Sequence, residues 1–337
     1  MNAGPSGLAE ASEKQGTSEA AEAPQVNIGR AALRSAAALL IAIGLCWYAS
    51  QGISHHELRE AIHALPTEPL IASLLVFTLS FFTADVLGFG LSWRTHLARE
   101  VPWRDVRALV CGKQVLALAL PVLTKVVGPL YFWRRWRISP TRALGASELV
   151  NACDLTTVVL FTSVPLLLSD IQLGTGLTAV VAAWWALALA AGAWLWSPQL
   201  RRLWPRARSA GLLEAFTTAT RAELAKLMGL RIAHQLVLLA CVRSLLAAMG
   251  ARLSLSQLAA FGPLFIFSGA LPISLAGFGG PQGLAVALLA HRWGLMAPGQ
   301  AMAFSLVWSA GFLLLQMGVA VAHFPRMLTL LRARPNG

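Results

Sequence analysis

The sequence predicts an all-α polytopic membrane protein with six to eight transmembrane helices, and three observations support this fold class. Of the 337 residues, 56% are hydrophobic and 12% are charged, whereas a soluble domain carries about 25% charged residues. The mean hydropathy is +0.63, and several apolar runs approach the roughly 20 residues that a spanning helix needs. Two further apolar segments, Leu116–Trp133 and Phe265–Leu289, are broken by proline and glycine.

The first residues differ in kind from the rest of the chain. Residues 1–29 are rich in Ala, Glu, Ser, Gly and Gln and have no apolar periodicity, which is typical of a disordered tail. They lack the basic start and apolar core of a signal peptide. We therefore expect a disordered tail over 1–29, an integral membrane domain over 30–326 and a short cytoplasmic tail over 327–337.

Six full spans are predicted from the apolar runs, and they lie at Ala31–Gln51, Leu70–Trp93, Leu144–Leu168, Leu177–Trp196, Leu230–Met249 and Gln300–Phe324. The broken segments, about Val106–Tyr131 and Gln257–Trp293, are either re-entrant hairpins or additional spans. Irregular backbone at membrane depth is tolerated only where protein buries it or where it lines a cavity. These two segments are therefore the expected location of a site inside the bilayer.

Basic residues are distributed unevenly between the connections. Lys and Arg accumulate on the cytoplasmic side of membrane proteins. Most of them lie in the stretches that contain Arg30, Arg94, Arg134, Arg206, Arg231 and Arg326. The other connections carry only Arg59, Arg252 and Arg292. This count places both termini in the cytoplasm, and it explains most of the net charge of +12.

The two broken segments then face opposite sides of the membrane. Basic loops flank the first segment, so it enters and leaves from the cytoplasmic side, whereas the second enters and leaves from the outside. The order span, span, broken segment, span is repeated with opposite orientation, which is the inverted-repeat arrangement of many transporters. Charge does not distinguish re-entrant hairpins from pairs of full crossings.

Polar residues inside apolar spans are costly in lipid and are often functional. The buried acidic candidates are Asp85, Glu148 and Asp154, and the last two lie on roughly one helix face with Asn151. The candidates for contact with a lipid headgroup are Lys125, Arg243, Lys113, Arg134 and Gln282. Helix breaks or gates are expected at Pro121, Gly128, Pro272, Ser274, Gly277, Gly279 and Gly280.

Structural roles compete with these functional hypotheses. Arg243 is expected either to reach a shared cavity with Lys125, or to extend to the membrane surface or pair structurally with a carboxylate. Asp85 is either a proton-coupling residue or one member of a static ion pair with Lys125. The four cysteines lie in apolar runs without metal-ligand spacing, so we expect no metal, no disulfide and no cofactor. Nucleic acid is not an expected partner, because no soluble basic domain is evident.

Two stretches of the chain resemble the lysylphosphatidylglycerol synthase transmembrane family, also called flippase-like membrane proteins. LPISLAGFGGPQGLAVALL resembles the closing signature of the family, in which Pro272, Ser274, Gly277 and Gly279 match, followed by Gly294. LPVLTKVVGPLYFWRRW resembles the earlier signature, with matches at Pro121, Gly128, Arg134, Arg135, Ser139 and Ala143. Pro281-Gln282 stands where the family usually has Arg-Glu, which puts any charge-dependent step at that position in doubt.

The resemblance implies a bacterial inner-membrane protein that moves a phospholipid, hopanoid or glycolipid between leaflets. It implies membrane lipids as partners, with an anionic or glycosylated headgroup, and an envelope-lipid biosynthetic enzyme as another possible partner. The soluble synthase domain would follow the last span and is not expected here, so we expect a transporter-like protein rather than an enzyme. The alternative is an accessory subunit, or a lipid-modifying transferase with Glu148 and Asp154 as working acids.

Overall fold

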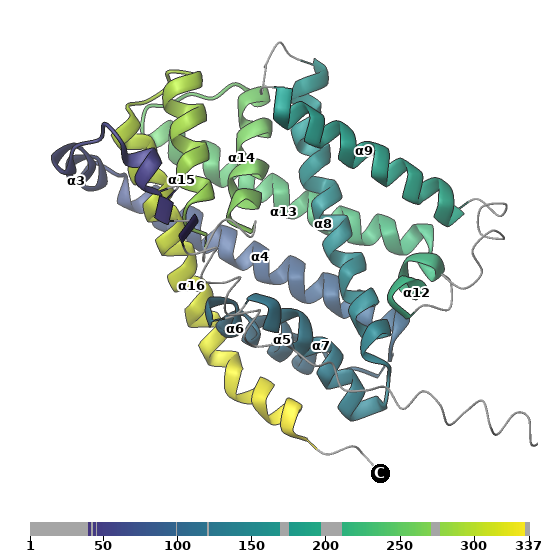
Figure 1. Ribbon diagram of the computed structural model, residues 1–337. Coiled ribbons are helices and arrows are strands. Elements are labelled where there is room, and N and C mark those ends of the chain that lie inside the picture. The colour runs from purple at the N-terminus through teal and green to yellow at the C-terminus, as the bar shows by residue number, and fades with distance from the viewer. Residues whose placement is uncertain are drawn as a thin grey trace, which may run out of the picture.

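The computed structural model describes residues 40–41, 43–44, 46–98, 100–119, 121–168, 175–196, 211–270 and 277–333. The predicted N-terminal tail, part of the first predicted span, Pro272 and Ser274 lie outside these ranges. Within these ranges, four helices are long and apolar enough to cross a membrane, namely α4 (Thr67–His96), α8 (Pro140–Leu168), α13 (Arg221–Ala248) and α16 (Pro298–Arg332). The prediction of an all-α polytopic membrane protein is confirmed (Figure 1).

The helices follow the predicted spans, with differences at their ends. Helix α9 (Thr175–Trp196) coincides with the fourth predicted span. Helix α13 begins at Arg221 rather than near Leu230, because the Thr220 hydroxyl accepts a hydrogen bond from the Glu223 backbone N–H at 3.2 Å and caps the helix. Helix α16 continues past Phe324 to Arg332, and Met327 within this extension is fully buried.

Two short helices in the described part of the chain lie outside the long spans and the broken segments. Helix α3 (His55–His63) begins at a capping box, in which Ser54 and Glu57 satisfy each other's backbone N–H groups. Helix α12 (Gly211–Thr218) packs against the start of α8. There the Gly145 Cα lies so close to the Leu212 carbonyl that a Cβ would come within 2.3 Å of that oxygen.

Each broken segment forms a group of shorter helices. The first consists of α5 (Trp103–Gly112), α6 (Gln114–Ala119) and α7 (Pro121–Trp136). The second consists of α14 (Leu255–Ala270), α15 (Gly280–Ala285) and a π-helix, η1 (Val286–Arg292). Proline at the first position of α7 suits a helix start, and Gly279 before α15 has a φ of 100° that favours glycine. The two groups lie at opposite ends of the molecule (Figure 1).

The packing between helices is paired as an inverted repeat requires. Helix α4 packs along α13, its counterpart in the second half. The first helix of the first broken segment, α5, packs against α16, and the first helix of the second broken segment, α14, packs against α8. These two contacts are equivalent if a two-fold axis exchanges the halves. The symmetry predicted from loop charge is therefore present in the contacts between helices.

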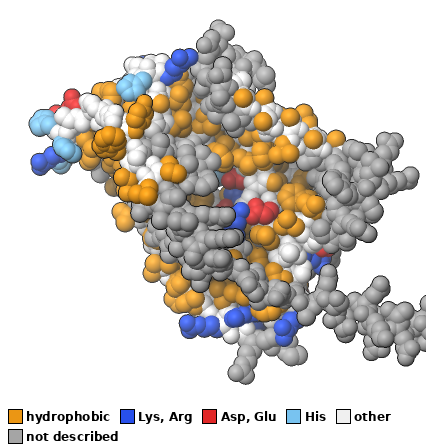
Figure 2. Space-filling view, viewed as in Figure 1, with side chains coloured by type: hydrophobic (Ala, Val, Ile, Leu, Met, Phe, Trp, Pro, Cys, Tyr) orange, Lys and Arg blue, Asp and Glu red, His pale blue; other side chains and the backbone are white. Residues whose placement is uncertain are grey.

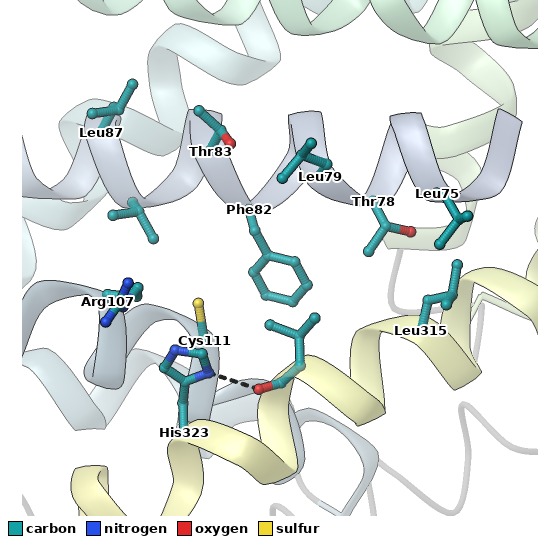
Figure 3. Close-up of a pocket in the computed structure, with 12 residues that line it drawn as sticks. Leu75, Thr78, Leu79, Phe82, Thr83, Leu87, Arg107, Cys111, Leu315 and His323 are labelled. Carbon is teal, nitrogen blue, oxygen red and sulfur yellow. Dashed lines mark hydrogen bonds between the residues drawn. The ribbon is translucent and has the colours of Figure 1, made fainter. Parts of the chain in front are cut away.

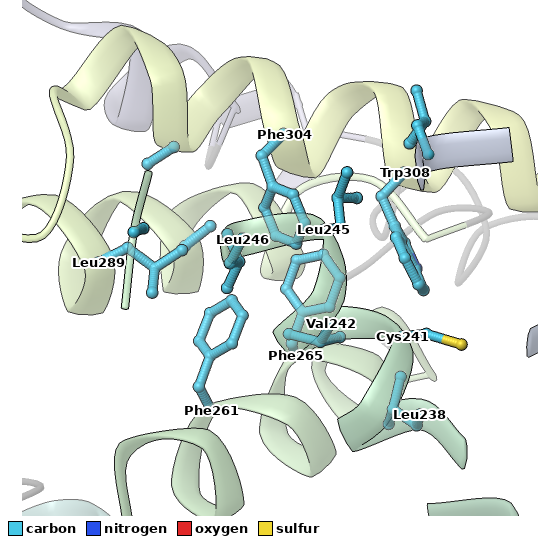
Figure 4. Close-up of a cluster of buried hydrophobic side chains, with 14 of the residues drawn as sticks. Leu238, Cys241, Val242, Leu245, Leu246, Phe261, Phe265, Leu289, Phe304 and Trp308 are labelled. Atoms are coloured by element: carbon cyan, nitrogen blue, oxygen red, sulfur yellow. The ribbon is translucent and has the colours of Figure 1, made fainter. Parts of the chain in front are cut away.

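The buried apolar side chains form two clusters, one around each broken segment. The first contains Trp93, Tyr131 and Phe132, together with apolar residues of α5, α8 and α12. The second joins aliphatic residues of α13 and η1 to aromatic rings of α14 and α16 (Figure 4), namely Phe261, Phe265, Phe304 and Trp308. Each broken segment therefore packs in a core to which both halves of the chain contribute.

Candidate functional site: a charged cavity beside the first broken segment

A cavity of about 330 Å³ lies between α4, α8 and the helices of the first broken segment. Aromatic and aliphatic side chains form part of its wall, and its polar lining consists of Lys113, Gln114, Thr124, Lys125, Ser147, Glu148 and Asn151. Gly128 lies in the wall against Trp93, at a distance where a Cβ would approach the indole to 3.0 Å. Figure 2 shows basic and acidic side chains together near the middle of a largely apolar face, beside a hollow.

Lys125 and Glu148 form an ion pair across the cavity. The Lys125 Nζ donates to Glu148 Oε1 at 2.9 Å, and the Asn151 amide donates to Glu148 Oε2 at 3.1 Å. The Lys125 side chain is 61% exposed and the Glu148 side chain 29%. Ion pairs at such exposure contribute about 0–1 kcal/mol, so a competing charged group can separate this pair at little cost.

Lys113 connects α5 to α6 and also lines the cavity. Its ammonium lies 3.9 Å from the centroid of the Phe89 ring, which is a cation–π contact. Within the described ranges, no carboxylate lies within 4.0 Å of this ammonium. Lys113 therefore retains hydrogen-bond donors for an anionic group inside the cavity.

Arg231 forms an ion cluster with two carboxylates from neighbouring helices, one buried and one partly exposed. Its Nη1 lies 2.8 Å from Asp85 Oδ1 on α4, and its Nε lies 3.7 Å from Asp154 Oδ1 on α8. The side chains of Arg231 and Asp85 are 4% and 11% exposed, whereas that of Asp154 is 42% exposed. Removing one partner of such a buried pair is strongly destabilising, because it leaves an uncompensated charge. This cluster fixes α4, α8 and α13 to one another.

The cavity and the ion cluster are coupled electrostatically through Lys113, which interacts with Asp85, Arg231 and Glu148. Together they contain three cationic and three anionic side chains, so the formal charges balance. Arg231 contacts two of the carboxylates and Lys125 the third, and among the described residues Lys113 is the cation of this group that contacts no carboxylate directly. The arrangement is suited to binding an anion rather than to acid–base chemistry with a nucleophile.

The structure brings together five of the predicted charged residues and places Arg134 and Arg243 elsewhere. Lys113, Lys125 and Glu148 line the cavity, and Asp85 and Asp154 meet at Arg231. Asp85 thus pairs with Arg231, not with Lys125 as the ion-pair alternative proposed. Arg134 donates to the Leu331 carbonyl of α16, and Arg243 is exposed on α13 and does not line the cavity.

The predicted helix breaks lie in both segments. Pro121 begins α7, and Gly128 lies within it beside the cavity. In the second segment Gly277 and Gly279 have positive φ, and Gly280 begins α15. Gln282, the residue at the departure from the family signature, is fully buried in this second segment and donates to Ser309 Oγ of α16 at 3.2 Å.

Sequence reasoning missed Arg231, which it counted among the basic residues of a cytoplasmic loop. The signal that locates it is the sequence Thr220-Arg-Ala-Glu223, an N-cap followed three residues later by Glu. This pattern moves the start of the helix to Arg221 and puts Arg231 three turns inside it. A charged residue buried within this helix, Arg231, is then expected.

Long apolar helices, paired broken segments and a charged cavity among them define a multi-pass helical membrane protein. Over residues 35–320 the chain matches the model of the family described as lysylphosphatidylglycerol synthase TM region. The chain belongs to this family, as the resemblance implied, and the family indicates a membrane protein of lipid metabolism or transport. The comparisons with curated proteins and with solved structures found no match.

Proposed function

We propose that this protein moves a lipid with a phosphate-bearing headgroup between the two leaflets of the membrane. The observation that carries the proposal is the ammonium of Lys113, which lies in a polar cavity without a carboxylate partner in the described part of the chain. An ionisable side chain at membrane depth indicates a substrate pathway unless it is paired. The family supports a role that involves membrane lipid.

The cavity offers a two-step interaction with an anionic headgroup. The headgroup phosphate first binds Lys113, and then competes with Glu148 for Lys125, whose ion pair is weak. A hydrogen bond to a charged group contributes about 1.5–3 kcal/mol, so Lys113 supplies about 10- to 100-fold in headgroup affinity. The Arg231 cluster keeps its own partners throughout and holds the surrounding helices in place.

Phospholipids are the favoured substrates within the class that the resemblance implies, because two lysines suit a phosphate better than a neutral sugar or a hopanoid. A bacterial inner membrane and cytoplasmic termini belong to the same proposal. The transferase alternative requires Glu148 and Asp154 to meet in one pocket. Glu148 faces Lys125 in the cavity, whereas Asp154 faces Arg231 and does not line it.

The test is leaflet translocation of fluorescent phospholipids in liposomes that contain the purified protein. We expect wild type to accelerate translocation over protein-free liposomes, and Lys113→Gln to reduce the rate at least ten-fold. Arg243→Gln is the matched control, because it removes a cation of α13 that does not line the cavity. Equal rates for wild type and Lys113→Gln, or no translocation by folded wild type with any phosphate-bearing lipid, would overturn the proposal.

A further inference from the structure

A second hollow in the molecule lies between α4, α5 and α16, and it differs from the charged cavity in being almost entirely apolar. We propose that it holds one acyl chain of an anionic phospholipid, whose phosphate is bound by Arg107. This lipid is a stably bound ligand at a site separate from the proposed translocation cavity. The proposal rests on the shape and charge of the hollow and does not require the protein to transport lipid.

The hollow, here called the groove, has a volume of about 440 Å³, and the Phe82 ring points into it from α4 (Figure 3). Its wall on α4 is a strip of side chains along one helix face, namely Leu75, Thr78, Leu79, Phe82, Thr83, Val86 and Leu87. From Leu75 to Leu87 this strip rises about 18 Å at 1.5 Å per residue. One leaflet contributes about half of the 30 Å hydrocarbon core, so the groove matches the depth of an acyl chain from one leaflet.

One end of the groove is polar. Figure 3 shows Arg107 and His323 near this end, and Leu75 and Leu315 near the other. Arg107 is exposed, and no ion pair to it is found within the described part of the chain. His323 directs Nδ1 to the Val319 carbonyl at 2.9 Å, which leaves Nε2 for another partner. A cation at one end of an apolar groove has the polarity of a phospholipid.

The position of the polar end indicates which lipid occupies the groove. Arg107 lies on α5 in the first broken segment, and His323 precedes the basic end of α16, which carries Arg326 and Arg332. The excess of basic residues assigns this end to the cytoplasmic side, where anionic lipids concentrate and basic pockets between helices bind their headgroups. Charge complementarity therefore selects an anionic phospholipid over a zwitterionic one.

The groove and the charged cavity share no lining residue, so their ligands can be distinguished by mutation. Leu79 is 71% exposed, and Leu79→Trp therefore fills the groove without disturbing a buried contact. Arg107→Gln removes the proposed phosphate ligand. Arg104→Gln is the matched control, since Arg104 is another exposed arginine of α5 that does not line the groove.

The experiment measures the melting temperature of the purified protein in detergent with phosphatidylcholine, as phosphatidylglycerol is titrated in. All variants carry Lys113→Gln, so that the charged cavity proposed for translocation does not bind the headgroup. We expect phosphatidylglycerol to raise the melting temperature of Lys113→Gln with and without Arg104→Gln alike. One basic residue near an anionic lipid contributes about 1 kcal/mol, so Arg107→Gln should need about five-fold more phosphatidylglycerol for half the effect. Leu79→Trp should abolish the effect.

Three results would overturn the inference. The first is an Arg107→Gln titration that coincides with that of the Lys113→Gln protein alone. The second is an effect that Leu79→Trp leaves unchanged in the same protein, which would place the lipid outside the groove. The third is equal stabilisation by water-soluble glycerophosphoglycerol, which would show that the apolar groove contributes nothing. Failure of the translocation proposal leaves all of these readouts unchanged.

Discussion

The two broken segments occupy equivalent positions in an inverted repeat, yet they are chemically different. The first contributes Lys113 and Lys125 to a charged cavity of about 330 Å³. In the described part of the second, the candidate site residue with a polar side chain is the neutral Gln282, which is fully buried. Its Oε1 accepts from the Gly279 backbone N–H at 2.6 Å, and its Nε2 donates to the Ser305 carbonyl at 3.3 Å and to Ser309 Oγ at 3.2 Å.

This difference shows how the two halves of a symmetric fold can have different functions. Buried polar groups that are fully hydrogen-bonded make a structure rigid, whereas a charge without a partner is available to a ligand. In the part of the second segment that the structure describes, Gln282 ties α15 to α16. In the described part of the first segment, Lys113 contacts the Phe89 ring but no carboxylate, which leaves donors for a ligand. Ligand binding is therefore assigned to the first half and a supporting role to the second.

The largest expected effect is a loss of stability when the charge cluster that supports the first segment is broken. Arg231→Met leaves Asp85 and Asp154 without their shared cation, and we expect it to lower the free energy of unfolding by about 3–5 kcal/mol. Reversible unfolding in mixed detergent micelles measures this. Adding Asp85→Asn and Asp154→Asn should restore most of the loss, and a single variant as stable as wild type would show that the cluster does not hold the helices.

The second-largest expected effect is a loss of stability when Gln282 is replaced, and it tests whether the second segment has a structural role. Gln282→Leu leaves the Gly279 N–H and the Ser309 hydroxyl unsatisfied, and we expect it to cost about 1–3 kcal/mol of stability. The rate of lipid translocation per folded molecule should not change. A large loss of rate without a loss of stability would contradict the comparison, since it would place function in the second half as well.

The smallest expected effect on stability comes from breaking the Lys125–Glu148 ion pair in the cavity. Glu148→Gln should change stability by less than about 1 kcal/mol, because the pair is partly exposed. It also removes the group that competes for Lys125, and two charges in water at 4 Å interact by about 1 kcal/mol. Anionic lipid should therefore bind up to about five-fold more tightly, as measured by competition with a fluorescent lipid. Weaker binding would mean that Glu148 itself contacts the headgroup.

Much of the fold was predictable because membrane spans follow from length and apolar composition alone. Loop charge also predicted the inverted repeat, which the equivalent contacts α5–α16 and α14–α8 support. Helix ends were less predictable, and the cap at Thr220 changes the environment of Arg231 from a loop to a buried site. The partners of each charge were not predictable, because they depend on helix rotation. Thus Asp85 pairs with Arg231, and Arg243 is exposed on the surface.

The central claim is that the first segment holds an accessible polar cavity and the second holds a closed contact. The most direct measurement is the rate at which a water-soluble thiol reagent labels Lys125→Cys and Ser309→Cys in proteoliposomes. Each variant is made after Cys46, Cys111, Cys153 and Cys241 are replaced by Ala. We predict that Lys125→Cys reacts at least ten-fold faster than Ser309→Cys, and that anionic lipid protects it. Equal rates, or faster labelling of Ser309→Cys, would contradict the account.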